Sequence, residues 1–196
     1  MEQTLAKGVF LELGFERASM DEVANRAKTS KRSVYAHFES KEKLFLAVIE
    51  LVRGLFLDRI KQPADYATKP ADALVAFLGR YLEAMLYESS VQMLRISMAE
   101  TTRFPEGARK HYDVMFTEVV ARVSGYLSAT FGLTARASTE AAQRLLGQIL
   151  FPAFPRALFG LEDLIEEFDE HALSPKIDLK PVRKAVAELL AVLPTG

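Results

Sequence analysis

The stretch AKTSKRSVYAHFESKEKLF, residues 27–45, decides the fold of the N-terminal part of this 196-residue chain. A helix begins near Ser30, and its first two residues, Lys31 and Arg32, are cations. The N-terminus of a helix carries partial positive charge and unpaired N–H groups, so cations there are mildly unfavourable unless an anion lies nearby. The segment therefore indicates a surface that binds an anion.

The distribution of charge supports this interpretation. The net charge of the whole chain is only −1, yet residues 26–43 hold six basic residues against two acidic ones. A short basic segment on an otherwise neutral protein is typical of a local anion-binding surface. Charge alone does not exclude a merely solvated surface, because exposed Lys and Arg residues usually have no partner of consequence.

The composition places the chain among ordinary globular proteins. It is 49% hydrophobic and 26% charged, and it contains no cysteine, which excludes disulfides, thiolate metal sites and a cysteine nucleophile. No apolar run is long enough to cross a bilayer, and the start of the chain lacks the pattern of a signal peptide. We therefore expect a cytoplasmic protein without membrane contact.

Apolar residues recur with helical period along nearly the whole chain, and no segment alternates as a strand would. A first helix ends at Gly14, where a left-handed cap belongs. Ser19-Met-Asp-Glu22 is a capping box that opens a short second helix. Residues 28–30 separate it from a third helix, whose inner face carries Val34 and Phe38. Two short helices joined by so tight a turn predict a helix-turn-helix motif.

The rest of the chain also reads as helices. Ser40 is the expected N-cap of a long fourth helix, and the break at residues 62–70 is a candidate boundary whose proline opens the next helix. A later helix is expected to open at Ser138 and to end at Pro152, and the last helix to begin at Pro181. We therefore predict an all-α fold. An N-terminal three-helix helix-turn-helix DNA-binding module, residues 1–45, is joined by the long fourth helix to a helical-bundle domain for ligand binding and dimerisation, residues 46–196.

In a helix-turn-helix motif the second helix lies in the major groove, and flanking groups hold phosphates. Lys31 and Arg32 are placed to reach guanine or phosphate, Lys41 to reach a phosphate, and the small Ala36 allows close approach to the bases. The expected anion is therefore double-stranded DNA. The predicted DNA-binding residues are Ser19, Lys28, Thr29, Ser30, Lys31, Arg32, Ser33, Tyr35, Ala36, His37, Lys41 and Lys43.

The same residues carry a family resemblance. Gly14-Phe15, Ser19-Met-Asp-Glu-Val-Ala24, Ser30-Lys-Arg-Ser-Val-Tyr-Ala-His-Phe38 and Ser40-Lys-Glu-Lys-Leu-Phe45 resemble the DNA-binding module of the tetracycline-repressor (TetR) family of bacterial transcription regulators. The stretch 95–106 resembles part of one group of C-terminal domains in that family. The resemblance implies an all-helical homodimer on a palindromic operator, with a C-terminal domain that binds a small molecule and releases the DNA.

One position departs from the family pattern. Lys28 stands where family members usually have glycine, and Thr29 where they often have an aliphatic residue. A residue other than glycine at positive φ costs on the order of 1 kcal/mol, so we expect a slightly strained or differently shaped turn. Lys28 is also a candidate for an additional phosphate contact.

The second half of the chain is rich in aromatic and methionine side chains, which favours a hydrophobic effector. Such side chains at helical spacing are more often plain core, so the two roles are not separated by sequence. The candidate pocket residues are Phe77, Tyr81, Met85, Met98, Tyr112, Met115, Phe116, Gln148 and Phe151. Two apolar helical faces near the C-terminus are candidates for a homodimer interface, through Leu145, Ile149, Ala185 and Leu189.

The acidic run at residues 162–170 matches no calcium loop or zinc site, so we expect a solvated face, no metal and no cofactor. The sequence lacks a phosphate-binding glycine loop, an HExxH motif and a nucleophile elbow, which argues against an enzyme. The predicted function is a ligand-responsive transcription regulator, a repressor that a small, largely apolar effector releases from its operator. The alternative is a helical ligand carrier or scaffold that has lost specific DNA reading.

Overall fold

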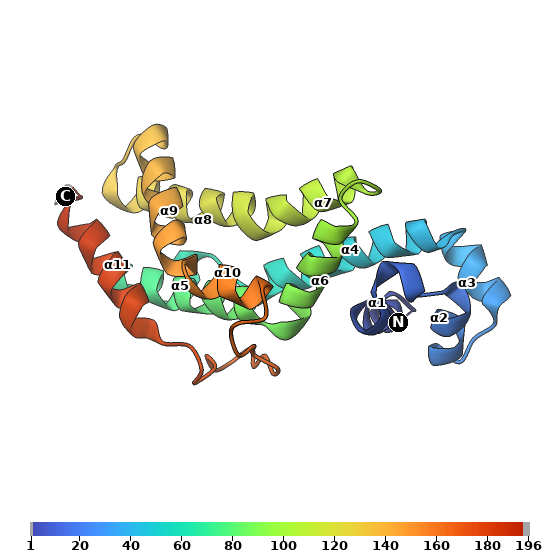
Figure 1. Ribbon diagram of the computed structural model, residues 1–196. Coiled ribbons are helices and arrows are strands. Elements are labelled where there is room, and N and C mark those ends of the chain that lie inside the picture. Colours follow the sequence, from blue (N-terminus) through green and yellow to red (C-terminus); the bar gives the residue numbers. More distant parts are fainter. Residues whose placement is uncertain (1, 194–196) are drawn as a thin grey trace. The chain divides into compact units, whose positions relative to one another are not determined.

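A computed structural model describes residues 2–193 of the chain. Within that range the protein is helical and contains no strand, only an isolated bridge between Tyr87 and Ile165. The all-α prediction is therefore confirmed (Figure 1). The elements are α1 (Glu2–Arg17), α2 (Met20–Arg26), α3 (Lys31–Phe38), α4 (Lys41–Arg59), the 3-10 turn η1 (Pro63–Asp65), α5 (Pro70–Leu86), α6 (Glu88–Ala99), α7 (Pro105–Tyr112), the π-helical turn η2 (Asp113–Thr117), α8 (Glu118–Phe131), α9 (Ala135–Leu150), α10 (Ala153–Leu158) and α11 (Leu179–Ala191).

The described chain forms two compact units. Unit 1 contains the residues up to Leu55 together with Gln92–Tyr112, and unit 2 contains Phe56–Val91 together with the residues from Asp113 onward. The backbone passes from one unit to the other inside α4, inside α6 and where α7 runs into η2. Segment 92–112 is thus part of the unit that holds the helix-turn-helix motif.

Four aromatic rings form the centre of unit 1. Phe10, Phe15 and Phe45 meet at ring-centroid distances of 5.1 to 6.1 Å, and Phe104 lies 5.0 Å from Phe15 and 5.2 Å from Phe45. All four side chains are buried. Aromatic rings in such stacked and edge-on contacts bury large apolar areas, so this cluster fixes α1 and α4 against each other and supports the short helices α2 and α3.

In unit 2, α5 is the central helix. Nearly every residue from Ala73 to Met85 is buried, because α5 packs against α11, α9, α10 and η1. Its first residue is Pro70, whose fixed φ and missing N–H suit the first turn of a helix, as predicted. Helices α8 and α9 pack against each other beside it.

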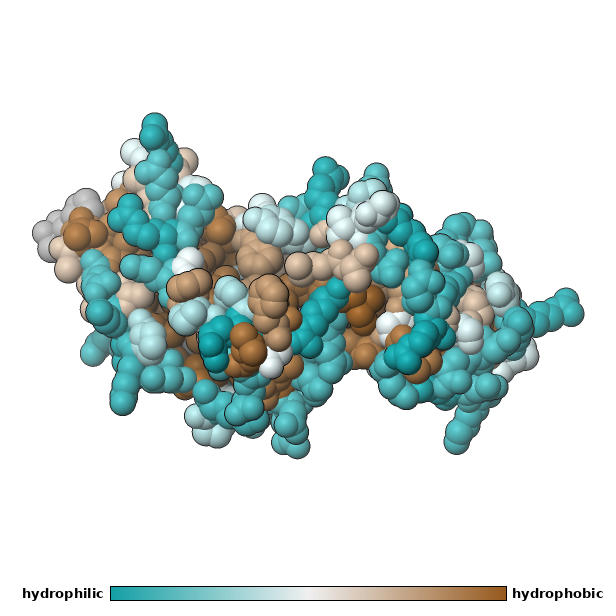
Figure 2. All heavy atoms as spheres, in the orientation of Figure 1, coloured by the Kyte–Doolittle hydropathy of each residue, from teal (hydrophilic) through white to brown (hydrophobic). Residues whose placement is uncertain are grey.

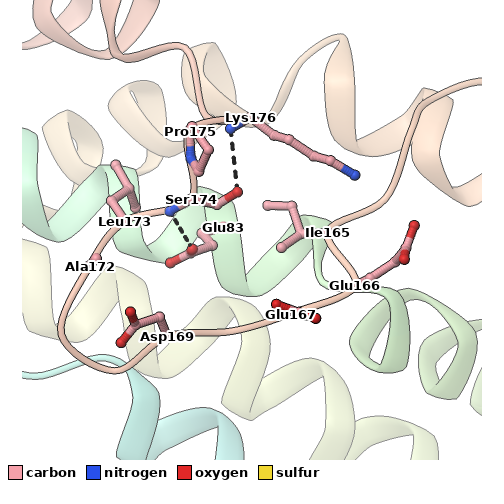
Figure 3. A pocket seen from close by; sticks show the side chains of 10 residues that line it. All are labelled: Glu83, Ile165, Glu166, Glu167, Asp169, Ala172, Leu173, Ser174, Pro175 and Lys176. Carbon is pink, nitrogen blue, oxygen red and sulfur yellow. Dashed lines mark hydrogen bonds between the residues drawn. The ribbon is translucent and has the colours of Figure 1, made fainter.

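Two charged residues on the buried face of α5 hold the segment between α10 and α11. Arg80 and Glu83 form an ion pair, and the Arg80 guanidinium donates to the carbonyl of Asp169 over 2.8 Å. The second carboxylate oxygen of Glu83 accepts the amide proton of Ser174 over 2.7 Å (Figure 3). These buried charges are therefore paired and hydrogen-bonded, which is what their burial requires.

The same segment encloses a cavity of about 390 Å³ with a mixed lining. Its walls combine the carboxylates of Glu166, Glu167 and Asp169 with apolar side chains such as Ile165 and Leu173 (Figure 3). Hydrogen bonding by the backbone amide of His171 lowers the pKa of Asp169, so its carboxylate is kept ionised. Within residues 2–193 no three His, Asp or Glu side chains are grouped as metal ligands, and no helix is both long and apolar enough to cross a membrane.

Candidate nucleic-acid interface

Helices α2 and α3 are short elements with capped N-termini, and they pack against each other. The hydroxyl of Ser19 accepts the amide proton of Glu22, and the hydroxyl of Ser30 accepts that of Ser33, each over 3.1 Å. These side chains satisfy amide groups that the first turn of a helix leaves open. On the inner face of α3, Val34 is buried and Phe38 is partly buried.

The turn between α2 and α3 keeps a shape that glycine favours, although it contains none. Lys28 has φ 51°, in the left-handed region. Its amide donates to the carbonyl of Asn25, and the amide of Thr29 donates to that of Ala24 over 3.1 Å. Lysine therefore adopts the conformation that the family pattern assigns to glycine, and the expected strain lies in the Lys28 backbone.

The predicted DNA-binding residues are Ser19 at the N-cap of α2, the residues of the turn between α2 and α3, those on α3, and two in the first turn of α4. Most are exposed, while Thr29, Ser33 and Lys41 are partly buried. Tyr35 is exposed over 42% of its surface. The face of unit 1 visible in Figure 2 is mainly hydrophilic around these helices.

The cations of this surface differ in whether they are already paired. The Lys31 ammonium lies 2.8 Å from a carboxylate oxygen of Asp21, which raises the pKa of Lys31, and Lys43 is paired with Glu39. Within the described range, Lys28 and Arg32 have neither an ion pair nor a hydrogen bond from their side chains. Both are therefore available to an incoming anion without giving up a contact.

Lys41 is placed differently from the other cations. Its ammonium donates to three backbone carbonyls, those of Phe15, Glu16 and Ala18, at 2.9, 3.2 and 3.1 Å. The sequence predicted a phosphate contact at this position, and that contact stays a prediction. The sequence predicted neither these carbonyl contacts of Lys41 nor the ion pair between Lys31 and Asp21. Both join residues that are ten or more positions apart in the chain.

The candidate pocket residues are divided between the two units and differ in burial. Phe77, Tyr81, Met85 and Met115 are each buried within unit 2, with at most 1% of their surface exposed. The remaining members are more exposed, and they are Met98 and Tyr112 in unit 1 and Phe116, Gln148 and Phe151 in unit 2. Inside unit 2 the Tyr81 hydroxyl donates to the carbonyl of Met115 over 3.0 Å.

The candidate dimer residues are mostly buried within the single chain. Leu145, Ile149 and Ala185 expose between 1% and 7% of their surface, and Leu189 is partly buried. Their side chains hold α9 against its neighbours in the same unit. A hollow of about 200 Å³ beside α9 and α11 is lined by Leu145 and Leu189 together with Ala141, Arg144, Gln148, Glu188 and Val192.

A chain that is helical over its described residues, with a capped helix-turn-helix and the free cation Arg32 on the second helix of that motif, belongs to the class of helix-turn-helix DNA-binding proteins. Comparison with known families agrees with that class. The family model "Bacterial regulatory proteins, tetR family" matches residues 4–48, and the model "AefR-like transcriptional repressor, C-terminal domain" matches residues 72–175. The chain belongs to the TetR family, and it is a DNA-binding transcription regulator.

Solved structures share the fold over almost the whole chain. A TetR-family transcriptional regulator from Mesorhizobium loti has a TM-score of 0.78 and 23% identity, covering 99% of this chain and 95% of that one. The flavonoid-responsive regulator FrrA has a TM-score of 0.74 and 26% identity, covering 100% and 96%.

Curated relatives match over shorter stretches. The transcriptional activator FasR of Mycolicibacterium smegmatis is 32% identical over 84 residues, which is 43% of this chain and 38% of FasR. The A-factor receptor protein of Streptomyces griseus is 42% identical over 45 residues, 23% of this chain and 16% of that protein. The chain thus spans less than half the length of these relatives.

Proposed function

We propose that the protein is a ligand-responsive repressor that binds a palindromic operator as a homodimer and is released by a small, largely apolar effector. The observation that carries the DNA-binding part is the surface of α3, where Arg32 is exposed and has no partner within the described range. A side chain in the first turn of a recognition helix is placed to read a base edge. Such a regulator acts where the chromosome is, in the cytoplasm.

Repression is supported by the C-terminal half. The repressor model covers residues 72–175, whereas the similarity to the activator FasR covers 43% of the chain. Whether the protein represses or activates depends on the position of the operator in the promoter. Measuring transcription from that promoter with and without the protein tests the proposed repression.

A homodimer follows from the way in which a palindrome is read. Two half-sites about one helical turn apart require two recognition helices. Because Leu145, Ile149 and Ala185 are buried within one chain, the outer faces of α9 and α11 supply the surface for a second copy. Val192, exposed over 73% of its surface, and the hollow beside Leu189 are the parts of this surface that a partner would cover.

The effector site that we propose is the aromatic interior of unit 2. Tyr81 on α5 and Met115 in η2 are joined by a hydrogen bond, and the Phe116 ring lies 6.0 Å from that of Phe154. A π-helical turn such as η2 strains the regular hydrogen-bonding ladder and often marks a functional site. The structural relative FrrA is flavonoid-responsive by name, and an aromatic, mostly apolar ligand of that kind suits these side chains.

The acidic cavity beside α5 is the competing place for a ligand. Glu167 and Asp169 would favour a cation there, while the aromatic interior favours a neutral compound. Either site belongs to unit 2, from which α4 runs into the DNA-binding unit. A ligand that moves the unit 2 end of α4 changes the setting of the recognition helices and so shifts the population of binding-competent dimers.

Selection of DNA from a random pool tests the proposal. The purified protein is incubated at moderate salt with duplexes that carry a randomised centre, and the retained DNA is sequenced. A palindrome with half-sites about one helical turn or slightly more apart supports a dimeric regulator. Weak retention of all sequences that vanishes with salt contradicts it and favours the ligand-carrier alternative. The mass of the free protein by light scattering tests the dimer separately.

A further inference from the structure

All three N–H groups of the ammonium of Lys41, the first residue of α4, donate hydrogen bonds within the protein. An ammonium group has three N–H donors, and the three carbonyls that accept them belong to Phe15, Glu16 and Ala18. The ammonium also lies 4.4 Å from the centroid of the Phe15 ring, in cation–π contact. A phosphate contact at this position would have to break at least one of these bonds.

The three carbonyls need a donor because α1 is interrupted at Gly14, shortly before them in the chain. The helix turns at Gly14, which has φ 71° and ψ 177°, so the residues after it do not continue a regular hydrogen-bonded helix. Carbonyls at the C-terminal end of a helix lack intrahelical partners and carry the negative end of the helix dipole. A lysine ammonium is a suitable cap for such a group, and here it arrives from α4.

The position of Lys41 in the chain gives this cap a consequence for α3. The recognition helix ends at Phe38, and Glu39 and Ser40 form the corner that leads into α4. Glu39 has φ 57°, an unfavourable backbone conformation for a residue other than glycine. Because Lys41 directly follows this corner, its contacts fasten the C-terminal end of α3 to the last turn of α1 and to Ala18 in the connection between α1 and α2.

The opposite end of α3 is held by the turn at residues 28–30, and few side chains fix the helix in between. Only Val34 is fully buried, and Phe38 is partly buried. The orientation of so short a helix depends strongly on its two corners. The cation that fastens one corner is therefore part of what sets the direction of the exposed face of α3.

We propose that Lys41 is a positioning residue for the DNA-reading helix and does not act as a phosphate ligand. The proposal rests on DNA binding through α3. It separates Lys41 from Lys43, which lies two residues further on and is exposed, and whose only ion-pair partner within residues 2–193 is Glu39 at the surface. A phosphate can displace the Glu39 side chain from Lys43 without disturbing the backbone. For Lys41 it would have to displace backbone carbonyls, which would lose their donor.

The experiment compares Lys41→Met with Lys43→Met in the full chain. Methionine keeps a long apolar side chain and removes the ammonium. Three quantities are measured: the melting temperature, the slope of log K against log salt with a random-sequence duplex, and the affinity ratio between the duplex recovered by selection and the random duplex. Binding is measured at a temperature at which melting shows every variant folded.

The proposal expects Lys41→Met to lower Tm by about 2–4 °C, since three carbonyls lose their donor. Its salt slope should equal that of the wild type, because no phosphate contact is lost. Its affinity ratio should fall about tenfold or more, because misdirected side chains no longer discriminate between bases. Lys43→Met should leave Tm and the ratio unchanged and flatten the slope by about one unit.

A Lys41→Met protein with unchanged Tm and a slope flattened by about one unit would overturn the proposal, because that is the behaviour of a phosphate ligand. Lower Tm with an unchanged affinity ratio would also overturn it, since the cap would then be structural only. If the wild type prefers no duplex, the proposed specific regulator fails, while the salt slope and Tm still decide whether Lys41 contacts phosphate.

Discussion

The ammonium of Lys31, the first residue of α3, lies 2.8 Å from a carboxylate oxygen of Asp21 on α2. Both side chains are more than half exposed, so the pair adds little to stability. We expect the pair to weaken DNA binding instead. Asp21 neutralises a cation of the recognition helix and places a negative charge near the expected position of the phosphates.

Replacement of Asp21 by asparagine should therefore strengthen non-specific DNA binding at low salt. Lys31 becomes free to contact phosphate, so the slope of log K against log salt should steepen by up to about one unit. Fluorescence anisotropy with a labelled random duplex over a range of KCl measures this slope. Glu140→Gln removes the same charge from α9 and serves as control. Equal slopes for Asp21→Asn and the control would refute the expectation.

Arg32 is expected to read a base, and a conservative change separates that role from plain charge. Lysine keeps the charge but cannot form the bidentate bonds that a guanidinium forms with guanine. Arg32→Lys should lower affinity for the selected duplex by about tenfold to a hundredfold, with little change for a random duplex. Titration of both duplexes at one salt concentration provides the comparison. Equal losses on both would make Arg32 a phosphate contact instead.

Lys28 combines a strained backbone with a free cation, and two substitutions distinguish these properties. Glycine removes the cost of φ 51°, and asparagine, which tolerates this region, removes the charge with less gain. Lys28→Gly should raise the free energy of unfolding by about 1 kcal/mol, measured by urea denaturation. Both variants should bind random DNA more weakly and with a flatter salt slope if the ammonium contacts phosphate. A glycine variant no more stable than the wild type would show that the turn is not strained.

Local patterns in the sequence were sufficient for the helix-turn-helix motif. The capping role of Ser19, the helix start near Ser30 and the inward position of Val34 depend on residues within one or two turns of the chain, and the structure confirms them. The same local logic placed the strain at Lys28. Such features follow from capping and helical period, which sequence shows directly.

Two helix starts in the second half were predicted wrongly. The helix expected at Ser138 begins at Ala135, because Thr134 is the N-cap and its hydroxyl accepts the amide proton of Ala137. The last helix begins at Leu179, with Asp178 as its N-cap, instead of at the proline two residues later. Several Ser, Thr and Asp residues near a helix start are equivalent caps by sequence, and tertiary packing selects among them.

The roles of individual side chains were the least predictable part of the site. From the sequence Lys41 was indistinguishable from a surface cation, because its three carbonyl partners lie 23 to 26 residues away in the chain. Likewise, Leu145 and Tyr81 have the apolar character of an interface or a pocket wall, yet both are buried within unit 2. Composition and period describe a face of a helix, but they do not say what covers it.

The two places proposed for a ligand can be separated by substitution. A flavonoid is the probe, and its binding should raise the Tm of the wild type as ligand concentration increases. Phe116→Ala should abolish this shift if the aromatic interior is the site, while Glu167→Gln in the acidic cavity should retain it. Loss of the shift only in Glu167→Gln would move the site to the cavity. The melting temperature of each variant without ligand is the reference.

His111 on α7 should make stability depend on pH. Only 1% of its surface is exposed, and among the residues that the structure describes its Nδ1 has no hydrogen-bond partner. Burial, together with the nearby Arg53 guanidinium, lowers the pKa of His111 to about 4. The unfolded chain, whose histidine has its ordinary pKa of about 6.5, therefore binds more protons between pH 6.5 and 4 than the folded chain does.

Stability that is present above pH 6.5 should consequently be lost as the pH falls toward 4, by about 3 kcal/mol from this residue. His111→Phe keeps a ring of similar size and cannot be protonated, so it should lose that part of the pH dependence. Urea denaturation at pH 7 and pH 4.5 measures the difference for each variant. Because carboxylates also titrate in this range, the comparison is with His171→Gln, which removes an exposed imidazole. If His111→Phe and His171→Gln weaken by the same amount on acidification, protonation of the buried histidine does not limit stability, and the interior around α7 must admit the charge.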